Sequence, residues 1–118
     1  MHIVNAAVLE QWSVLTDEQV VARVLTGQTA LFEVLMRRHT ERLYRTARAI
    51  TGDDEVAEDV VLQAFLNAYG RLREFNATAR FSTWLVRMVI HEARVRVHRR
   101  GRYSPVPVPV PVRPDRSH

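Results

Sequence analysis

Between residues 80 and 98, arginine, histidine and one tryptophan recur at alternating spacings of four and three. At about 100° per residue, side chains with this spacing fall within about 40° of one line along a helix, over roughly 27 Å. Guanidinium groups bind phosphate oxygens, and an aromatic ring among them can stack on an unpaired base. This cationic strip consists of Arg80, Trp84, Arg87, His91, Arg94 and His98. Residue types and spacing together favour binding of a phosphate backbone over several nucleotides.

A solvated charged face is the alternative interpretation of the strip, and Trp84 at helical spacing is also typical of a core residue. The placement of acids argues against a merely solvated face, because such surfaces usually interleave both signs. Over residues 80–102, Glu92 is the only acid. Residues 1–79 carry 8 Arg and 11 Asp or Glu, net −3, whereas residues 80–118 carry 9 Arg and 2 acids, net +7. Such a chain offers its basic end to phosphates and its acidic part to a basic protein surface.

The sequence lacks the residues that several classes of enzymatic and metal-binding site require. Cysteine is absent, which excludes disulfides, thiolate nucleophiles and cysteine-ligated metals. His91-Glu92 lacks the second histidine of a His-Glu-x-x-His zinc helix, because Val95 occupies that position. The acids of residues 53–59 are explained as the start of a helix, and no glycine-rich loop could hold a phosphate. We therefore expect no enzymatic activity, no catalytic residue, no metal site and no cofactor.

The composition is that of one soluble domain with a tail. The chain has 118 residues, of which 47% are hydrophobic and 25% charged, enough for a single core. No apolar run approaches the roughly 18–20 residues that cross a bilayer. The first residues lack the cationic and long apolar segments of a secretory signal. We therefore expect a cytoplasmic chain without a membrane span.

Four helices are predicted from apolar spacings of three, four and seven. The first begins with a capping box, in which Thr16 and Gln19 bind each other's backbone amides, and it ends near Gly27. The second ends at Gly52, and Asp53 with the acid after it caps the third. The expected ranges are about 16–27, 29–50, 53–72 and 79–100.

Three segments are expected along the chain. Residues 1–15 form a variable lead-in, residues 16–102 the helical domain, and residues 103–118 a proline-rich linker or tail. The four Pro-Val pairs after Ser104 exclude helix and predict a polyproline-type rod of roughly 25 Å. The predicted fold class is therefore all-α: a compact bundle of about four helices with a Pro-Val-rich extended C-terminal tail.

The order of short motifs along residues 16–102 resembles region 2 of the extracytoplasmic-function (ECF) sigma factors of the sigma-70 family. The motifs are Glu58-Asp59-Val60-Val61, Ala64-Phe65-Leu66, Ala68-Tyr69, Phe75 and Phe81-Ser82-Thr83-Trp84-Leu85, preceded by matching segments around 17–27, 32–38 and 42–52. The resemblance implies a sigma-region-2-like helical domain with two tasks in transcription initiation.

The first implied task is docking of the third helix on the β′ clamp helices of core RNA polymerase. By position, the residues on or near that surface would be Asp59, Leu62, Gln63, Phe65 and Leu66. The second implied task is opening of the promoter −10 element and holding of a flipped-out base of the non-template strand. This task would fall to the loop residues Asn76, Ala77 and Thr78 and to the cationic strip. Melting costs roughly 1.4 kcal/mol per base step in stacking, which phosphate contacts and stacking on the exposed strand must offset.

The chain departs from the family pattern at several of these positions. Leu62 and Gln63 stand where the family usually has Gln and Glu, and His91 stands where it has Asn. The loop has Asn76-Ala77 in place of Arg-Gly. A second domain that reads the −35 element is missing from this sequence, which is expected to be either a fragment or a single-domain variant.

These departures leave two alternatives open. One is a degenerate sigma-like regulator that binds an anti-sigma factor or RNA polymerase without initiating transcription. The other is a helix bundle that binds nucleic acid regardless of sequence. Transcription from a −10-only promoter separates the first from an initiating sigma domain, and sequence preference separates the second.

Overall fold

The computed structural model describes residues 12–76 and 78–102, with side chains described up to residue 100. In this part of the chain there are four α-helices, two 3₁₀ turns and no strand. The elements are α2 (Asp17–Leu25), a 3₁₀ turn (Thr29–Leu31), α3 (Phe32–Thr51), α4 (Asp54–Gly70), a second 3₁₀ turn (Leu72–Glu74) and α5 (Phe81–Arg102). The predicted all-α fold class is therefore confirmed. The lead-in up to residue 11, Ala77 and the Pro-Val tail lie outside the described residues.

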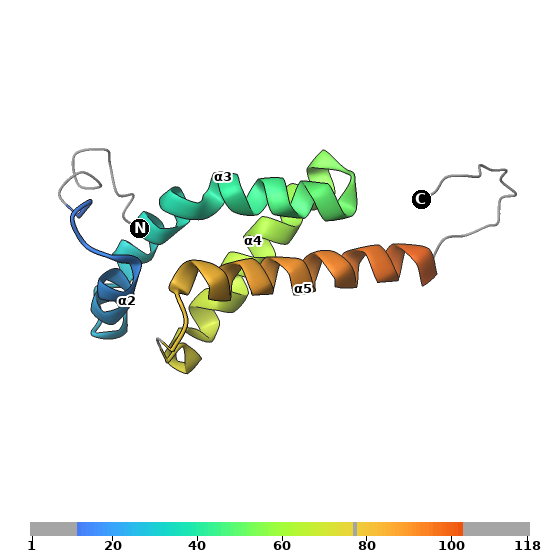
Figure 1. Ribbon diagram of the computed structural model, residues 1–118. Helices are drawn as coiled ribbons and strands as arrows, with labels where there is room; N and C mark the ends of the chain where they lie inside the picture. Colours follow the sequence, from blue (N-terminus) through green and yellow to red (C-terminus); the bar gives the residue numbers. More distant parts are fainter. Residues whose placement is uncertain (1–11, 77, 103–118) are drawn as a thin grey trace, which may run out of the picture.

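The three long helices pack against one another in pairs, and α2 contacts α3 and α5 near their first residues. Figure 1 shows α3 and α5 running alongside each other, with α4 crossing behind them. Every helix contributes a fully buried side chain to one core, and burial of each such side chain contributes about 1.5–3 kcal/mol. The largest are Val20, Leu35, Leu43, Val60, Phe81, Leu85 and Val89.

The predicted first helix begins and ends as its local sequence indicates. The N–H of Gln19 donates to Oγ1 of Thr16 (3.1 Å), and the N–H of Thr16 donates to Oε1 of Gln19 (2.8 Å). At its end, the N–H of Gln28 reaches the carbonyl of Arg23 and that of Gly27 reaches the carbonyl of Val24. Because Gly27 has φ +116°, these two bonds close a Schellman motif without a side-chain clash.

The other helix boundaries differ by one to three residues from the expected ones. A 3₁₀ turn precedes α3, so the α-helix begins at Phe32 and not near residue 29. Gly70 is the last residue of α4, which was expected to reach about residue 72. α5 begins at Phe81 and not near residue 79, and the Phe81 N–H donates a hydrogen bond to Oε2 of Glu18 (2.8 Å), 63 positions earlier in the chain.

Two glycines at helix ends should respond oppositely to alanine. Gly52 has φ +70°, a conformation that costs an L-residue about 1–2 kcal/mol, so Gly52→Ala should lower the free energy of unfolding by that amount. Gly70 ends α4 with open space around the position of a Cβ atom, so Gly70→Ala should raise the free energy of unfolding by about 0.5–1 kcal/mol. Urea denaturation of both variants measures these changes; an equal effect of both substitutions would contradict the assignment of Gly52 to the left-handed conformation.

A carboxylate at the start of α2 joins this helix to α3. Oδ1 of Asp17 accepts a hydrogen bond from Nη1 of Arg38 (2.9 Å), and Oδ2 lies 2.8 Å from Nε2 of His39. Burial acts to raise the pKa of the Asp17 carboxyl, but the hydrogen bonds and charges of His39 and Arg38 outweigh burial and hold this pKa below its usual value. The cluster fastens α2 across the end of the bundle.

The Asp17 cluster should make stability depend on pH. Because the pKa of Asp17 is lower in the folded chain, its contribution is present above the ordinary aspartate pKa of about 3.9 and is lost as pH falls through the folded value. At pH 7, Asp17→Asn should lower the free energy of unfolding by about 1–3 kcal/mol, because Arg38 and His39 lose a charged partner.

Denaturation of wild type and Asp17→Asn at neutral pH and at pH 3 or below tests this linkage. The stability difference between the two proteins should shrink toward acid pH. Asp59→Asn, a change of an exposed carboxylate on α4, is the matched control and should show little effect at either pH. A difference for Asp17→Asn that is the same at both pH values would exclude the linkage.

Candidate protein and nucleic-acid interfaces

The cationic strip lies on the solvent-facing side of α5. Of its six residues, Arg80, Arg87, His91, Arg94 and His98 are exposed. Over the described ranges 12–76 and 78–100, no acidic side chain forms an ion pair with any of its three arginines. Glu92, the acid nearest to the strip in sequence, pairs with Arg96 (3.0 Å) on the inner side of the helix. The strip guanidinium groups are therefore available to an external anion.

Trp84 lies at the edge of the strip and not on a free face. Its ring is half-buried and belongs to an aromatic cluster with Phe75 and Phe81, whose ring centroids are 5.4 and 5.7 Å away. One part of the indole is thus fixed by packing, and the remaining part borders a cleft of about 240 Å³. The cleft is lined by Asn67, Arg71, Trp84, Arg87, Met88 and His91.

The cleft adds two residues that the sequence analysis missed. Asn67 and Arg71 come from the end of α4 and the turn after it, and they face Arg87 and His91 of α5 across the cleft. The spacing within one helix indicates which side chains share its face, but not which neighbouring helix supplies the opposite wall. The cleft has groups that bind a nucleotide: the guanidinium of Arg87 for phosphate, an amide, and an indole edge for the base, whereas the guanidinium of Arg71 pairs with Glu74 (3.0 Å).

Asn76 and Thr78, two of the predicted loop residues before α5, are joined by hydrogen bonds. Oδ1 of Asn76 accepts hydrogen bonds from the backbone N–H (3.1 Å) and the hydroxyl (2.8 Å) of Thr78. Both residues are exposed, and Ala77 between them lies outside the described part of the chain. The carboxamide oxygen of Asn76 is therefore occupied by Thr78 in this structure.

The outer face of α4 carries an apolar stripe. Leu62, Leu66 and Tyr69 are 54%, 58% and 45% exposed, and their spacing of four and three puts them on one side of the helix. Asp59 is exposed near the N-terminal end of the stripe. Tyr69 was not among the predicted site residues, although its spacing from Leu62 could have indicated it. Three adjacent exposed apolar side chains on one helix are typical of a surface that binds another protein.

Two predicted residues of α4 do not lie on this exposed stripe. Phe65 is only 3% exposed and packs edge-on against Phe32 of α3 at a centroid distance of 6.2 Å, so it supports the surface from beneath. Gln63 is half-buried and donates a hydrogen bond to Oδ1 of Asn67 (3.0 Å). α4 buries a broad face because it contacts both α3 and α5, and this width turns position 65 inward.

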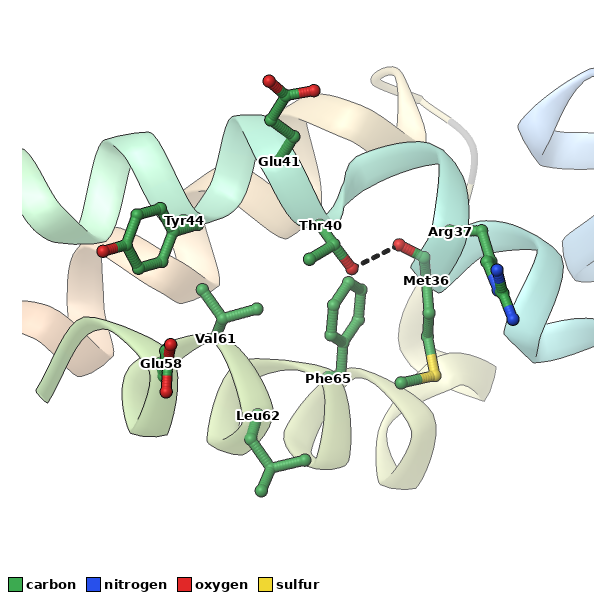
Figure 2. A pocket seen from close by; sticks show the side chains of 9 residues that line it. All are labelled: Met36, Arg37, Thr40, Glu41, Tyr44, Glu58, Val61, Leu62 and Phe65. Carbon is green, nitrogen blue, oxygen red and sulfur yellow. Dashed lines mark hydrogen bonds between the residues drawn. The ribbon is translucent and has the colours of Figure 1, made fainter. Parts of the chain in front are cut away.

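A groove of about 660 Å³ runs between α3 and α4 beside the stripe. Figure 2 shows Met36 and Phe65 between the two helices, whereas Leu62 points away to the outer side. At one end, Arg48 and Tyr44 donate hydrogen bonds to Oδ1 of Asp54 (2.6 and 2.9 Å), and these bonds, with the charge of Arg48, lower the pKa of Asp54. The groove is lined by Met36, Arg37, Thr40, Glu41, Tyr44, Glu58, Val61, Leu62 and Phe65. Its floor is apolar and its acids, Glu41 and Glu58, are exposed.

The family model for sigma-70 region 2 matches residues 35–103, more than half of the chain. The chain belongs to the sigma-70 family, as a region 2 domain. It is 33% identical over 89 residues to the RNA polymerase sigma-H factor of Pseudomonas aeruginosa, a match that covers 75% of the chain and 46% of that protein. It is 32% identical over 91 residues to the ECF RNA polymerase sigma-E factor of Escherichia coli (77% and 47%). It is 30% identical over 93 residues to the ECF RNA polymerase sigma factor SigM of Mycobacterium tuberculosis (79% and 47%).

The region 2 domain spans about half the length of the curated relatives that it matches. No solved structure gives a significant match to the chain. Within the described residues, no helix has the length and apolar character that crossing a bilayer requires. In the same part of the chain, no cluster of three or more His, Cys, Asp or Glu is placed to hold a metal ion.

Proposed function

We propose that this sigma region 2 domain binds core RNA polymerase through α4 and the non-template strand of a promoter −10 element through the loop before α5 and α5 itself. The single observation that carries the proposal is the contrast between two neighbouring helices. α4 exposes Leu62, Leu66 and Asp59, whereas α5 exposes a strip of basic side chains whose arginines have no acidic partner among the described residues. The family membership supports the pairing of these two surfaces in one domain.

The two partners follow from the chemistry of each surface. An apolar stripe with acids at its start fits a basic, partly apolar protein helix, which the β′ clamp helices would supply. The exposed arginines fit phosphates of a separated strand, and the cleft between α4 and α5 fits one unstacked base. Each contact with the single strand offsets part of the cost of melting. Such partners imply a cytoplasmic location.

Two binding assays test this function together. Pull-down with core RNA polymerase measures the first contact, and fluorescence anisotropy with single-stranded −10 oligonucleotides against a randomised pool measures the second. The expected result is retention on polymerase and tighter binding to one −10 sequence than to the pool. Failure to bind polymerase together with equal affinity for all strands would contradict the proposal.

A protein-binding regulator is the second candidate, and the exposed Leu62 favours it. Position 62 is usually Gln in the family, and here a hydrocarbon side chain is 54% exposed on the proposed polymerase surface. A leucine at this place suits an apolar partner such as an anti-sigma factor, or a polymerase contact that does not lead to initiation. Transcription from a −10-only promoter with added core polymerase separates the two functions, because a regulator gives no transcript.

A further inference from the structure

The residues that begin α2 also hold the start of α5. The backbone N–H of Phe81, the first residue of α5, donates a 2.8 Å hydrogen bond to Oε2 of Glu18. The first N–H groups of a helix have no partner within the helix, and Arg80 just before it has no side-chain acceptor. Glu18 therefore supplies from another helix, 63 residues away, the carboxylate that a local capping residue usually provides.

Glu18 is held in position by its neighbour in sequence. Asp17 binds Arg38 and His39 of α3 at 2.9 and 2.8 Å, which fixes the first turn of α2 against that helix. His39 is buried (9% exposed), and its ring lies 6.2 Å from the Phe81 ring, centroid to centroid. The adjacent carboxylates of Asp17 and Glu18 thus bind α2 to both α3 and α5. Phe81 is contacted through its backbone N–H by Glu18 and through its ring by His39.

Phe81 connects this cap to the nucleic-acid surface. It is fully buried, and its ring lies 5.4 Å from Phe75 and 5.7 Å from Trp84. The loop toward α5 leaves from Phe75, and Trp84 borders the cleft between α4 and α5. A displacement of Phe81 would therefore move the loop and Trp84 together.

We propose that Glu18 is a positioning residue for nucleic-acid binding. Its hydrogen bond to Phe81 sets the place at which α5 begins, and thereby the positions of Trp84 and of the first residues of the cationic strip. It acts through Phe81 and not by contact with the strand. The proposal deepens the function proposed above and, for its effect on DNA, rests on it.

Two substitutions separate the effect of the side-chain length of Glu18 from the effect of its charge. Glu18→Gln keeps the length and an oxygen acceptor but loses the charge, whereas Glu18→Asp keeps the charge but is too short to reach the Phe81 amide. In the full chain, Glu18→Asp should weaken binding to fluorescein-labelled single-stranded oligonucleotides by about 3- to 10-fold, and Glu18→Gln should stay within about twofold of wild type. Loss of negative charge alone would strengthen binding to an anionic strand, so an effect of charge alone predicts that Glu18→Gln binds more tightly than wild type and that Glu18→Asp binds as wild type does.

A control variant and a second measurement distinguish a positioning role of Glu18 from an effect of its charge. Glu41→Gln removes a charge from an exposed site on α3 and should leave strand affinity within about twofold of wild type. The chain has two tryptophans, so in a Trp12→Phe background fluorescence reports on Trp84 alone. Without DNA, Glu18→Asp should increase acrylamide quenching of Trp84, and polymerase retention through α4 should not change.

Several results would overturn the positioning role of Glu18. One is a Glu18→Asp variant that matches wild type in strand affinity and in Trp84 quenching. Another is an equal loss of polymerase retention, which would mean that the whole domain and not α5 is disturbed. If the wild-type chain binds no single strand, the proposed function fails by itself, and the quenching of Trp84 alone decides whether Glu18 positions α5.

Discussion

Replacing Leu66 by aspartate is expected to weaken binding of the domain to core RNA polymerase by about 30-fold or more. Leu66 is 58% exposed in the middle of the apolar stripe on α4, where a partner helix would cover it. A buried carboxylate without a partner costs at least as much as the loss of an interface hot spot, about 2 kcal/mol. Pull-down or interferometry with purified core polymerase measures the change.

Val14→Asp is the matched control for this substitution. Val14 is 84% exposed in the segment before α2, so the control introduces the same charge at an exposed aliphatic position away from α4. It should leave polymerase affinity within about twofold of wild type, as is usual for surface substitutions outside an interface. If both variants lose affinity equally, or if Leu66→Asp binds as wild type does, the α4 stripe is not the polymerase surface.

The double substitution Arg87→Ala/Arg94→Ala is expected to weaken binding to single-stranded DNA by about 10-fold or more at low salt. Both guanidinium groups are exposed on α5 and lack an acidic partner among the described residues. Each phosphate contact with a single strand contributes about 0.7 to the slope of log affinity against log salt concentration. Loss of two contacts should therefore reduce the slope by about 1.4.

The control for the strip removes the same charge from another helix. Arg37 and Arg45 of α3 form i,i+4 ion pairs with Glu33 and Glu41, at 3.5 and 3.0 Å. Arg37→Ala/Arg45→Ala lowers the net charge equally and should change affinity only through the long-range field, with little change in the salt slope. Equal slopes for the two double variants would show that net charge, and not the strip, governs binding.

Features set by neighbouring residues were predictable from the sequence. The capping box of Thr16 and Gln19, the helix ends at Gly27 and Gly52 and the cap at Asp53 all involve contacts within five positions along the chain. Their geometry is decided by local backbone conformation and needs no tertiary contact. The exposure of the arginines and histidines of the cationic strip followed in the same way, because their spacing puts them on one side of the helix.

Features set by contacts between helices were not predictable. The bond from Phe81 to Glu18 joins residues 63 apart, at the first residue of α5. Phe65 was placed on or near the polymerase surface by its position in the family motif, but it is 3% exposed and packs against Phe32 of α3. Trp84 was considered as either a core or a stacking residue, and only the positions of Phe75 and Phe81 show that it is partly both.

Site-specific photo-cross-linking tests the division of labour between α4 and α5 most directly. A photoreactive residue is placed at Leu66 of α4 in one variant and at His91 of α5 in another, because both positions are exposed. Each variant is irradiated in a mixture with core RNA polymerase and a single-stranded −10 oligonucleotide. We expect position 66 to cross-link to β′ and position 91 to the oligonucleotide. Cross-links from position 66 to DNA, or from position 91 to polymerase alone, would contradict the assignment of the two surfaces.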